Sequence, residues 1–341
     1  MTSTTNQQIL LASRPSGEPT TANFKQVEVP LKQPGEGGVL VRHHYMSLDP
    51  YMRGRMNEGK SYVAPQPLGE VMGGGTVGEV VASRNAAFAV GDKVVGMGGW
   101  QQFQCVEAGA VATLQKVDAS QIPLSAYLGA VGMPGVTAWQ GLTQIIAPKP
   151  GETLVVSAAS GAVGSAFGQL AKARGARVVG LAGGAEKCAY VKSELGFDEC
   201  IDYKRHGDLK SLVAALSAAC PKGIDGYFEN VGGMTLDAVL QLANTFARVA
   251  VCGLISGYNG APIPLANPML ILVNRMKLQG FIVTDRLDLW PAALQELGGM
   301  VAAGTLKYRE TVAHGLASAP DAFIGLLGGR NFGKQLVKLV D

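Results

Sequence analysis

The chain has 341 residues, of which 47% are hydrophobic and 16% charged, and its formal net charge is +3. This length suffices for about two domains with cores of their own, and the apolar fraction excludes a disordered chain. The near-balance of 29 Lys and Arg against 26 Asp and Glu gives no reason to expect nucleic acid or an acidic membrane surface as a partner.

The first third of the chain is dense in strand-forming residues, most clearly at 39–48 and 73–83. Its short apolar runs are separated by clusters of glycine, asparagine and proline. This pattern predicts a small barrel or an irregular sandwich.

From about Pro148 onward, continuous apolar runs alternate with segments of 3.6-residue periodicity, which is typical of βαβ units around a parallel sheet. Strands are expected at 153–158, 176–183, 199–204, 223–232 and 248–256, and helices at 165–175, 186–196, 208–220 and 236–246. The tail predicts two helices and a final strand at 335–340, which can return to either domain.

A glycine-containing turn follows the strand expected at 153–158 and opens a helix. In the dinucleotide fingerprint GxGxxG, Ala159 takes the first place, and Gly161 and Gly164 take the other two. The helix N-terminus supplies unpaired N–H groups and partial positive charge for phosphates. The alternative is a glycine turn that closes an ordinary βα unit, but the flanking strands and helix favour dinucleotide binding.

The end of the next strand bears on the choice of cofactor. An NAD-binding protein carries Asp or Glu about 20 residues after the turn, whereas this chain has Leu181-Ala-Gly-Gly184 and no acid before Glu186. Lys187 can supply a point charge and Tyr203 a hydroxyl to a 2′-phosphate. The alternative for Lys187 is a solvated helix charge. The missing acid and the added cation favour NADP(H) over NAD(H).

With these residues the chain resembles the zinc-independent branch of the medium-chain dehydrogenase/reductases, in particular the prostaglandin reductase, 2-alkenal reductase and curcumin reductase group. The combination of LDPYMRGRM (48–56) with CGLISGYN (252–259) is the most specific part of this resemblance. The matching segments are LDPYMRGRM (48–56), GMPGVTAWQGL (132–142), SGAVGSAFGQLAKARGARVVGLAGG (160–184), YFENVGG (227–233), CGLISGYN (252–259), GFIV (280–283) and NFGK (331–334).

The resemblance implies an N-terminal GroES-like β-barrel catalytic domain (1–130 and 302–341), an inserted Rossmann domain with a doubly wound parallel sheet (131–301), and NADP(H) in the cleft between them. A homodimer is implied through the Rossmann domains, with 264–273 as the edge strand at the contact. One departure is Gly184, where the family usually has a serine that can contact the phosphate.

The resemblance also implies the cofactor contacts, which divide into three groups. The pyrophosphate would contact Gly161, Ala162, Val163 and Gly164. The 2′-phosphate would contact Lys187 and Tyr203. The ribose and nicotinamide would contact Asn230, Cys252, Gly253, Leu254, Ile255, Ser256, Gly257, Tyr258, Phe281, Ile282, Val283 and Asn331.

A metal site is not expected. Zinc-containing relatives carry a Gly-His-Glu segment, and this chain has Leu68-Gly69-Glu70 at the comparable place, without the histidine. It also lacks the lobe with four closely spaced cysteines. No histidine lies at a regular spacing from a cysteine, so the sequence predicts no zinc ligands.

Without a metal, a hydroxyl donor is the expected stabiliser of the charge that forms on a substrate carbonyl. The resemblance indicates Tyr258 and Tyr51 as catalytic candidates, and the α-carbon proton would come from water or a tyrosine relay. Tyr258 has the alternative role of an aromatic packed against the cofactor, and Tyr51 that of a pocket wall or domain-interface anchor. Arg53 and Arg55 are expected to fix the loop or the domain interface, and the His43–His44 pair to be structural.

These features predict NADPH-dependent reduction of the carbon–carbon double bond of α,β-unsaturated aldehydes and ketones. The alternatives are a quinone reductase of the same superfamily and a non-catalytic NADPH-binding protein.

No signal peptide is expected, because no basic residue precedes the short apolar patch 9–12. The uncharged stretches 119–148 and 249–274 are interrupted by proline and glycine, which argues against membrane spans. Five scattered cysteines fit a reduced, cytoplasmic protein.

Overall fold

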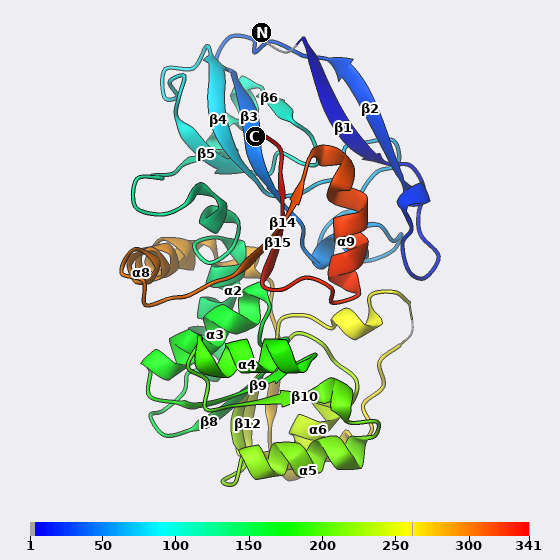
Figure 1. Cartoon of the computed structure of the whole chain (residues 1–341), viewed down its shortest axis with the longest axis vertical. Coiled ribbons are helices and arrows are strands. Elements are labelled where there is room, and N and C mark those ends of the chain that lie inside the picture. Colours follow the sequence, from blue (N-terminus) through cyan, green and yellow to red (C-terminus); the bar gives the residue numbers. More distant parts are fainter. Residues whose placement is uncertain (1–3, 261, 341) are drawn as a thin grey trace. The chain divides into compact units, whose positions relative to one another are not determined.

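The computed structural model (Figure 1) describes residues 4–260 and 262–340. These residues form two compact units. The first unit comprises residues up to 128, 310–331 and from 335 on, and the second unit comprises 129–309 and 332–334.

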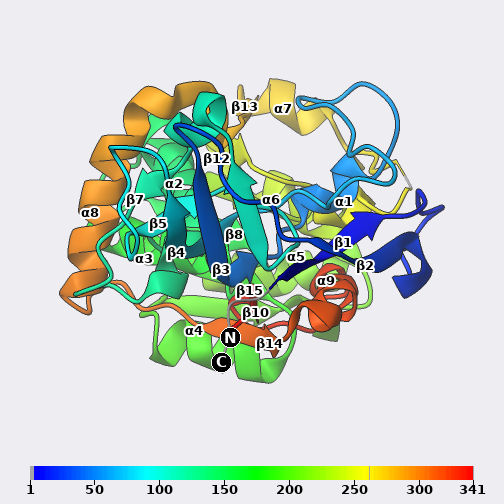
Figure 2. The ribbon, with the colours of Figure 1, turned by 90° about the horizontal axis from the view of Figure 1, so that it is seen from above.

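The first unit contains a hairpin, β1–β2, and an antiparallel sheet in the order β14-β15-β3-β4-β5-β7, with β6 also paired to β3. Strands β3, β4 and β5 lie side by side in Figure 2. The strands are β1 (Thr5–Leu11), β2 (Phe24–Pro30), β3 (Val39–Ser47), β4 (Thr76–Ser83), β5 (Lys93–Gly96), β6 (Phe103–Val106), β7 (Gln115–Lys116), β14 (Glu310–His314) and β15 (Lys334–Lys338). Because β15 pairs with β3, the final strand returns to the sheet of the first unit.

Short helices and 3₁₀ turns complete the first unit. They are η1 (Thr21–Asn23), α1 (Tyr51–Arg55), η2 (Ala108–Thr113), η3 (Leu124–Leu128), η8 (Leu316–Ser318) and α9 (Ala319–Leu327). Helix α9 adds Phe323 to a core in which the Trp100 ring stacks on Phe24 at 5.4 Å and meets Phe323 edge-on at 5.6 Å. Since Trp100 is fully buried, this aromatic cluster anchors α9 and β2 in one core.

The buried His43 supports the structural role expected for it. Its Nδ1 lies 2.8 Å from the carbonyl oxygen of Gln101, and because a carbonyl only accepts, Nδ1 carries the proton. The ring is so tightly enclosed that a Cβ at Gly98 would lie 2.3 Å from its Cε1 and Nε2 atoms. Burial lowers the pKa of His43 to about 4, although the hydrogen bond to Gln101 opposes this shift.

His43 should make the protein sensitive to acid. Its ordinary pKa of 6.5 applies in the unfolded chain, which therefore takes up the proton first as the pH falls. The stability that depends on a neutral ring is complete above pH 6.5 and is lost toward pH 4, a loss of about 3 kcal/mol. Denaturant unfolding of wild type and His43→Gln at pH 7.5 and 4.5 measures this. The wild type should lose about 3 kcal/mol more than the variant between these pH values, and equal losses would contradict the assignment.

The second unit is built on a parallel sheet in the order β10-β9-β8-β11-β12-β13. Taken in chain order from β8, this is the arrangement 3-2-1-4-5-6 of dinucleotide-binding folds. The strands are β8 (Thr153–Ser157), β9 (Arg177–Ala182), β10 (Glu199–Asp202), β11 (Ile224–Glu229), β12 (Ala243–Val251) and β13 (Lys277–Gly280). The predicted Rossmann architecture is therefore confirmed.

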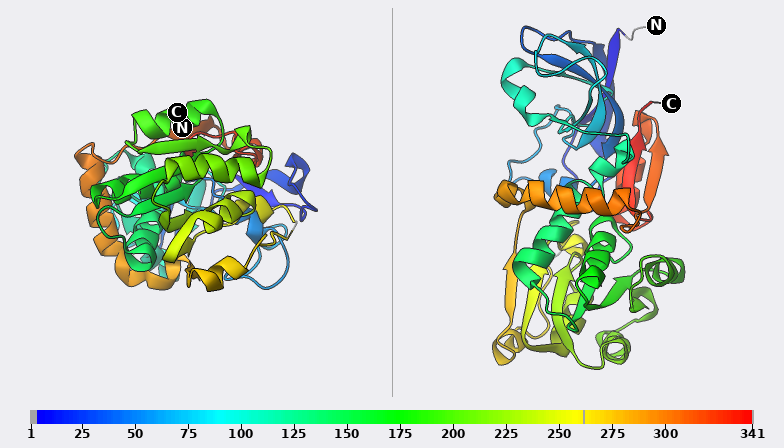
Figure 3. Two further views of the ribbon diagram at one scale, coloured as in Figure 1. Left: turned by 90° about the horizontal axis from the view of Figure 1, so that it is seen from below. Right: turned by 90° about the vertical axis from the view of Figure 1, so that its left-hand side faces the viewer.

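Helices cover both faces of this sheet. Leu154 and Val156 of β8 contribute to the core beneath α2, α3, α4 and α8, whereas Val155 between them contributes to the core beneath α5 and α6. In Figure 3, α8 (orange) runs beside the green helices α2 and α3. The helices and turns are α2 (Met133–Gln140), η4 (Gly141–Ile146), α3 (Ala162–Ala173), α4 (Ala185–Ser193), η5 (Tyr203–Arg205), α5 (Leu209–Ala219), α6 (Met234–Leu242), η6 (Ile255–Gly257), α7 (Met269–Val273), η7 (Val283–Leu289) and α8 (Trp290–Ala302).

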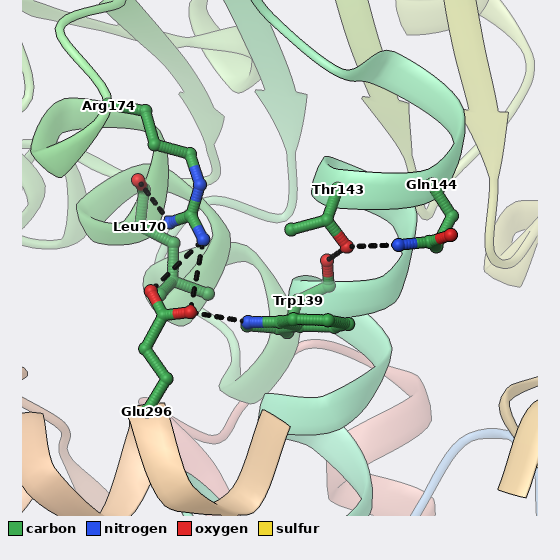
Figure 4. A network of polar contacts seen from close by, with 6 residues as sticks. All are labelled: Trp139, Thr143, Gln144, Leu170, Arg174 and Glu296. Carbon is green, nitrogen blue, oxygen red and sulfur yellow. Dashed lines mark hydrogen bonds and ion pairs between the residues drawn. The ribbon is translucent and has the colours of Figure 1, made fainter. Parts of the chain in front are cut away.

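A polar network joins three of these helices (Figure 4). Glu296 of α8 accepts a hydrogen bond from the Trp139 indole of α2 at 2.7 Å and two from Arg174, which follows α3, at 3.0 and 3.1 Å. Arg174 also donates to the Leu170 carbonyl at 3.1 Å. Both hydrogen bonds from Arg174 to Glu296 come from one guanidinium nitrogen, Nη2, while Nη1 binds Leu170, so the network ties α8 to α2 and to the end of α3.

Three predictions of secondary structure were wrong. The edge strand expected at 264–273 is instead irregular backbone followed by α7, and β13 forms that edge; the prolines at 264 and 268 remove ladder donors. The helix expected at 236–246 ends at Leu242, and β12 begins at once, because residues 243–251 pair with β11 and β13. The strand expected at 248–256 ends at Val251, where the chain turns into η6.

Residues 4–260 and 262–340 contain no helix that is both long and apolar enough to span a bilayer.

Candidate functional site

The glycine turn between β8 and α3 has the geometry of a phosphate cradle. Gly161 is the N-cap of α3, and its N–H donates to the Ala158 carbonyl at 2.8 Å. A Cβ at Gly164 would lie only 2.4 Å from that same carbonyl oxygen, so this close packing of α3 on the strand end requires glycine. Ala158 adopts a left-handed φ of 50°, a strain of roughly 1–2 kcal/mol for a non-glycine residue. The turn thus combines a strained backbone with a free helix N-terminus.

Of the two residues that the sequence indicated for a 2′-phosphate, Lys187 lies in the first turn of α4, which follows β9, and Tyr203 directly follows β10. A Cβ at Gly183 would lie 3.1 Å from the Tyr203 hydroxyl and 2.9 Å from Cε of Lys204. Burial lowers the pKa of Lys187, and the nearby Lys204 ammonium lowers it further. Two ammonium groups and a hydroxyl therefore share this place, and Lys204 is a member that the sequence analysis missed.

Asp202, the last residue of β10, is engaged in hydrogen bonds with the backbone beside this cationic group. Asp202 Oδ1 accepts hydrogen bonds from the N–H of Gly184 at 2.8 Å and from the N–H of Lys204 at 3.2 Å. Gly184 is the N-cap of α4 with a φ of 107°, a conformation that a serine would adopt only under strain. Gly184, which stands where the family usually has serine, thus has a backbone conformation that favours glycine.

A second feature at the turn is the segment 332–334, which belongs to the same unit. Gly333 forms a parallel bridge with Gly161, and a Cβ at Gly333 would lie 1.9 Å from the Arg309 carbonyl oxygen. The Arg309 guanidinium lies 3.9 Å from the centre of the Phe332 ring, and Tyr190 meets that ring edge-on at 5.0 Å. This stack holds the segment beside the glycine turn. Sequence reasoning found only the neighbouring Asn331, which lies in the first unit.

The predicted residues Asn230 and Cys252–Tyr258 come together beyond the ends of β11 and β12. The Asn230 carbonyl accepts from the N–H of Ile255 at 3.1 Å, and the Ser256 hydroxyl donates to the Val231 carbonyl at 2.6 Å. A Cβ at Gly253 would lie 3.1 Å from the Tyr258 hydroxyl, so the missing side chain at Gly253 leaves room for that hydroxyl. The Tyr258 oxygen is therefore placed close to Asn230 within one loop cluster.

The buried Glu229 connects these loops, and sequence reasoning missed it. Its Oε1 accepts from the Ser157 hydroxyl at 2.7 Å and from the N–H of Val231 at 2.6 Å. Its backbone carbonyl accepts from the N–H groups of Cys252 and Gly253 at 2.9 and 3.1 Å. Burial raises the pKa of Glu229. The pair Glu229-Asn230 at the end of an apolar strand is the signal that would have suggested an acid at the carboxyl edge of the sheet.

Ser157 extends this connection to the amide of Asn230. The N–H of Asn230 donates to the Ser157 hydroxyl, and the Asn230 amide nitrogen donates to the Ser157 carbonyl, both at 2.8 Å. Burial raises the pKa of the Cys252 thiol to about 12, so it is neutral at pH 7 and acts as a small packing residue.

Phe281, Ile282 and Val283 follow the end of β13. The Phe281 ring meets Phe228 edge-on at 6.1 Å, and the Val283 carbonyl accepts from the Trp290 indole at 3.1 Å. These contacts fix the segment at the carboxyl edge of the sheet, where dinucleotide-binding folds place their ligands.

Tyr51 begins α1 in the first unit. Burial raises its pKa, with a contribution from Asp49, so the phenol remains protonated at neutral pH. Arg53 is buried, and its guanidinium donates to the Asn57 side chain at 2.6 Å and to the Gly17 carbonyl at 2.7 Å. These contacts support the expected loop-fixing role of Arg53.

Within the described ranges 4–260 and 262–340, no three His, Cys, Asp or Glu side chains gather in a way that could hold a metal ion.

The strand order and glycine turn define the class of nucleotide-dependent oxidoreductases, and comparison with known proteins identifies the family. The family described as N-terminal domain of oxidoreductase matches residues 7–116, and the family described as zinc-binding dehydrogenase matches residues 162–298. The chain belongs to the medium-chain dehydrogenase/reductases, in the group of curcumin, 2-alkenal and prostaglandin reductases.

Two curated relatives and one crystal structure illustrate the similarity. NADPH-dependent curcumin reductase of Escherichia coli is 48% identical, covering 98% of this chain and 97% of the relative. NADP⁺-dependent 2-alkenal reductase of Nicotiana tabacum is 44% identical, covering 97% of each chain. The crystal structure of CurA from Vibrio vulnificus in complex with NADPH has a TM-score of 0.91 and 46% identity, covering 98% of this chain and 99% of that one.

Proposed function

We propose that this protein reduces the carbon–carbon double bond of α,β-unsaturated aldehydes and ketones with NADPH. The observation that carries the proposal is the second unit's combination of a glycine cradle at Gly161–Gly164 with the Lys187, Tyr203 and Lys204 cluster. The similarity to curcumin and 2-alkenal reductases supports the same substrate class.

The residues present fit NADPH. The turn at 161–164 would hold the pyrophosphate at the start of α3 through the backbone N–H groups of 162–164, since the N–H of Gly161, the N-cap, donates to the Ala158 carbonyl. The Lys187 and Lys204 ammonium groups would meet the 2′-phosphate with the Tyr203 hydroxyl. Asn230, the loop 252–258, 281–283 and Asn331 would line the ribose and nicotinamide. When bound, the reduced nicotinamide supplies the hydride.

Hydride addition at the β-carbon leaves negative charge on the carbonyl oxygen of the substrate. The Tyr258 hydroxyl is the proposed donor to this oxygen, because the loop cluster holds it in place before the reaction. The neutral phenol of Tyr51 is the second candidate donor, since its raised pKa keeps its proton in place at neutral pH.

The function is tested by following NADPH oxidation with an enone such as 3-nonen-2-one and, separately, with a simple quinone. The proposal expects turnover of the enone to the saturated ketone. Turnover of the quinone alone would instead identify a quinone reductase. Tight NADPH binding without turnover of either would identify a non-catalytic binding protein.

Location in the cytoplasm stays a prediction.

We also propose that two copies associate through the β13 edge of the second unit, as expected for the family. Exposed apolar side chains flank this edge, namely Phe246, Met269, Leu272 and Val273 at 57–71% exposure. The unpaired side of β13 and this apolar patch both suit a second copy of the chain. Sedimentation at micromolar concentration tests this, and a monomer would refute it.

A further inference from the structure

Two cysteines of the second unit meet between α4 and the sheet. Cys200 of β10 pairs in register with Gly180 of β9, and its sulfur lies 3.3 Å from where a Gly180 Cβ would be. Val191 of α4 lies 3.2 Å from that same point, so the Cys200 sulfur is on the face covered by α4. Cys188, three residues before Val191 on α4, has its sulfur 4.0 Å from the Ala182 carbonyl of β9. Gly180 and Ala182 point to the same face of β9, so Cys188 and Cys200 lie on the same face of the sheet beneath α4, and each thiol shifts the pKa of the other.

Each of these cysteines is close in the chain to a residue of the cationic cluster. Cys188 directly follows Lys187 in the first turns of α4, and Cys200 precedes Tyr203 by three residues at the end of β10. Two further contacts join these chain segments: the Gly184 N–H donates to Asp202 at 2.8 Å, and the Lys192 ammonium of α4 pairs with Glu199 of β10 at 2.7 Å. A bond between the two sulfurs would therefore move α4 relative to β10 close to Lys187 and Tyr203 of the cationic cluster.

We propose that Cys188 and Cys200 are a reversible redox modification site, at which oxidation by a hydroperoxide forms a disulfide and weakens NADPH binding. The effect on binding rests on the proposed function, whereas formation of the disulfide does not.

The chemistry balances with hydrogen peroxide as the oxidant. The Cys188 thiolate attacks one peroxide oxygen, the O–O bond breaks, and a sulfenic acid and hydroxide result. The Cys200 sulfur then displaces the hydroxyl of the sulfenic acid, forming the S–S bond. The two thiol protons combine with the two hydroxides, so two thiols and one peroxide give one disulfide and two waters. A low-molecular-weight dithiol reverses the reaction by exchange.

The surroundings favour Cys188 as the attacking thiol. The Cys200 thiol lowers the pKa of Cys188, while the Cys188 thiol and burial raise the pKa of Cys200. The partial positive charge at the start of α4 acts in the same direction on Cys188. A disulfide holds the two sulfurs at about 2.05 Å and the two Cα atoms within about 7 Å, so its formation constrains α4 against β10.

The test uses the reduced full-length protein, treated with a small excess of hydrogen peroxide, alkylated and mapped by mass spectrometry. NADPH affinity is measured by fluorescence before oxidation, after it, and after added dithiothreitol. We expect a Cys188–Cys200 linked peptide and a rise of about 10-fold in the NADPH dissociation constant, since a shift of about 1 Å at a binding group has effects of this order. Dithiothreitol should restore the affinity.

Three variants give the controls. Cys188→Ser and Cys188→Ala should show neither the linked peptide nor the loss of affinity, and Cys220→Ser, which removes a buried thiol outside the pair, should behave as wild type. Oxidation of wild type without the linked peptide would overturn the proposal, as would a linked protein that binds NADPH unchanged. If the reduced protein does not bind NADPH, the proposed function fails, and the peptide map alone decides whether the pair forms.

Discussion

Replacing Tyr258 with phenylalanine is expected to lower kcat for an enone by about 100- to 1,000-fold, as in other sites that lose one donor to a developing oxyanion. The physical reason is the position of the hydroxyl. It lies 3.1 Å from where a Gly253 Cβ would be, in a loop cluster fixed by backbone hydrogen bonds to Asn230 and Val231. The variant keeps the ring, so the packing of the loop and the binding of NADPH should stay within about threefold.

Steady-state kinetics with one enone and a fluorescence titration with NADPH measure both quantities. Tyr127→Phe is the matched control, because it removes a hydroxyl whose partner, the Asp118 carbonyl at 2.6 Å, lies outside the candidate site. A Tyr258→Phe enzyme with kcat close to wild type would show that Tyr258 is only a packing residue. In that case the donor would have to be sought elsewhere, with Tyr51 as the next candidate.

Lys187→Glu is expected to raise the dissociation constant for NADPH by about 100-fold and to leave that for NADH within about threefold. A carboxylate facing the 2′-phosphate replaces attraction by repulsion, and juxtaposed like charges cost several kcal/mol. NADH lacks the phosphate and should not respond. Lys204 would remain near the phosphate, so the loss is large but not complete.

Lys192→Glu provides a matched control on the same helix. Lys192 lies five residues after Lys187 on α4, and its ammonium pairs with Glu199 at 2.7 Å on the exposed side. This variant reverses the same charge and should not change either affinity by more than about twofold at 150 mM salt. Equal losses for NADPH and NADH in Lys187→Glu would mean that the residue supports α4 and does not recognise the phosphate.

Local sequence patterns predicted the repeated βαβ units of the second unit. The βαβ periodicity indicated β8, β9, β10 and their helices, because buried parallel strands are apolar runs with few alternatives. The glycine turn was found because close packing of α3 on β8 leaves its mark in the sequence, at Gly164. Segment 264–273 was misread because its apolar residues suit a strand and a short helix equally well, and only the pairing of β12 with β13 excludes the strand.

Several features of the candidate site depend on contacts between residues far apart in the chain, which periodicity does not reveal. Glu229 reaches Ser157 across the sheet, and Phe332 meets Arg309 through the returning chain. The Cys188–Cys200 contact requires the packing of α4 on β10. The sequence did not single out these residues, since the partner of each one is set by tertiary structure.

The most direct test of the central claim is to trace the hydride with NADPH deuterated at C4 of the nicotinamide, on the transferred side. The product of an enone is analysed by NMR and mass spectrometry. We expect one deuterium at the β-carbon of a saturated ketone. Deuterium at the carbonyl carbon of an alcohol, or a product without deuterium, would contradict it.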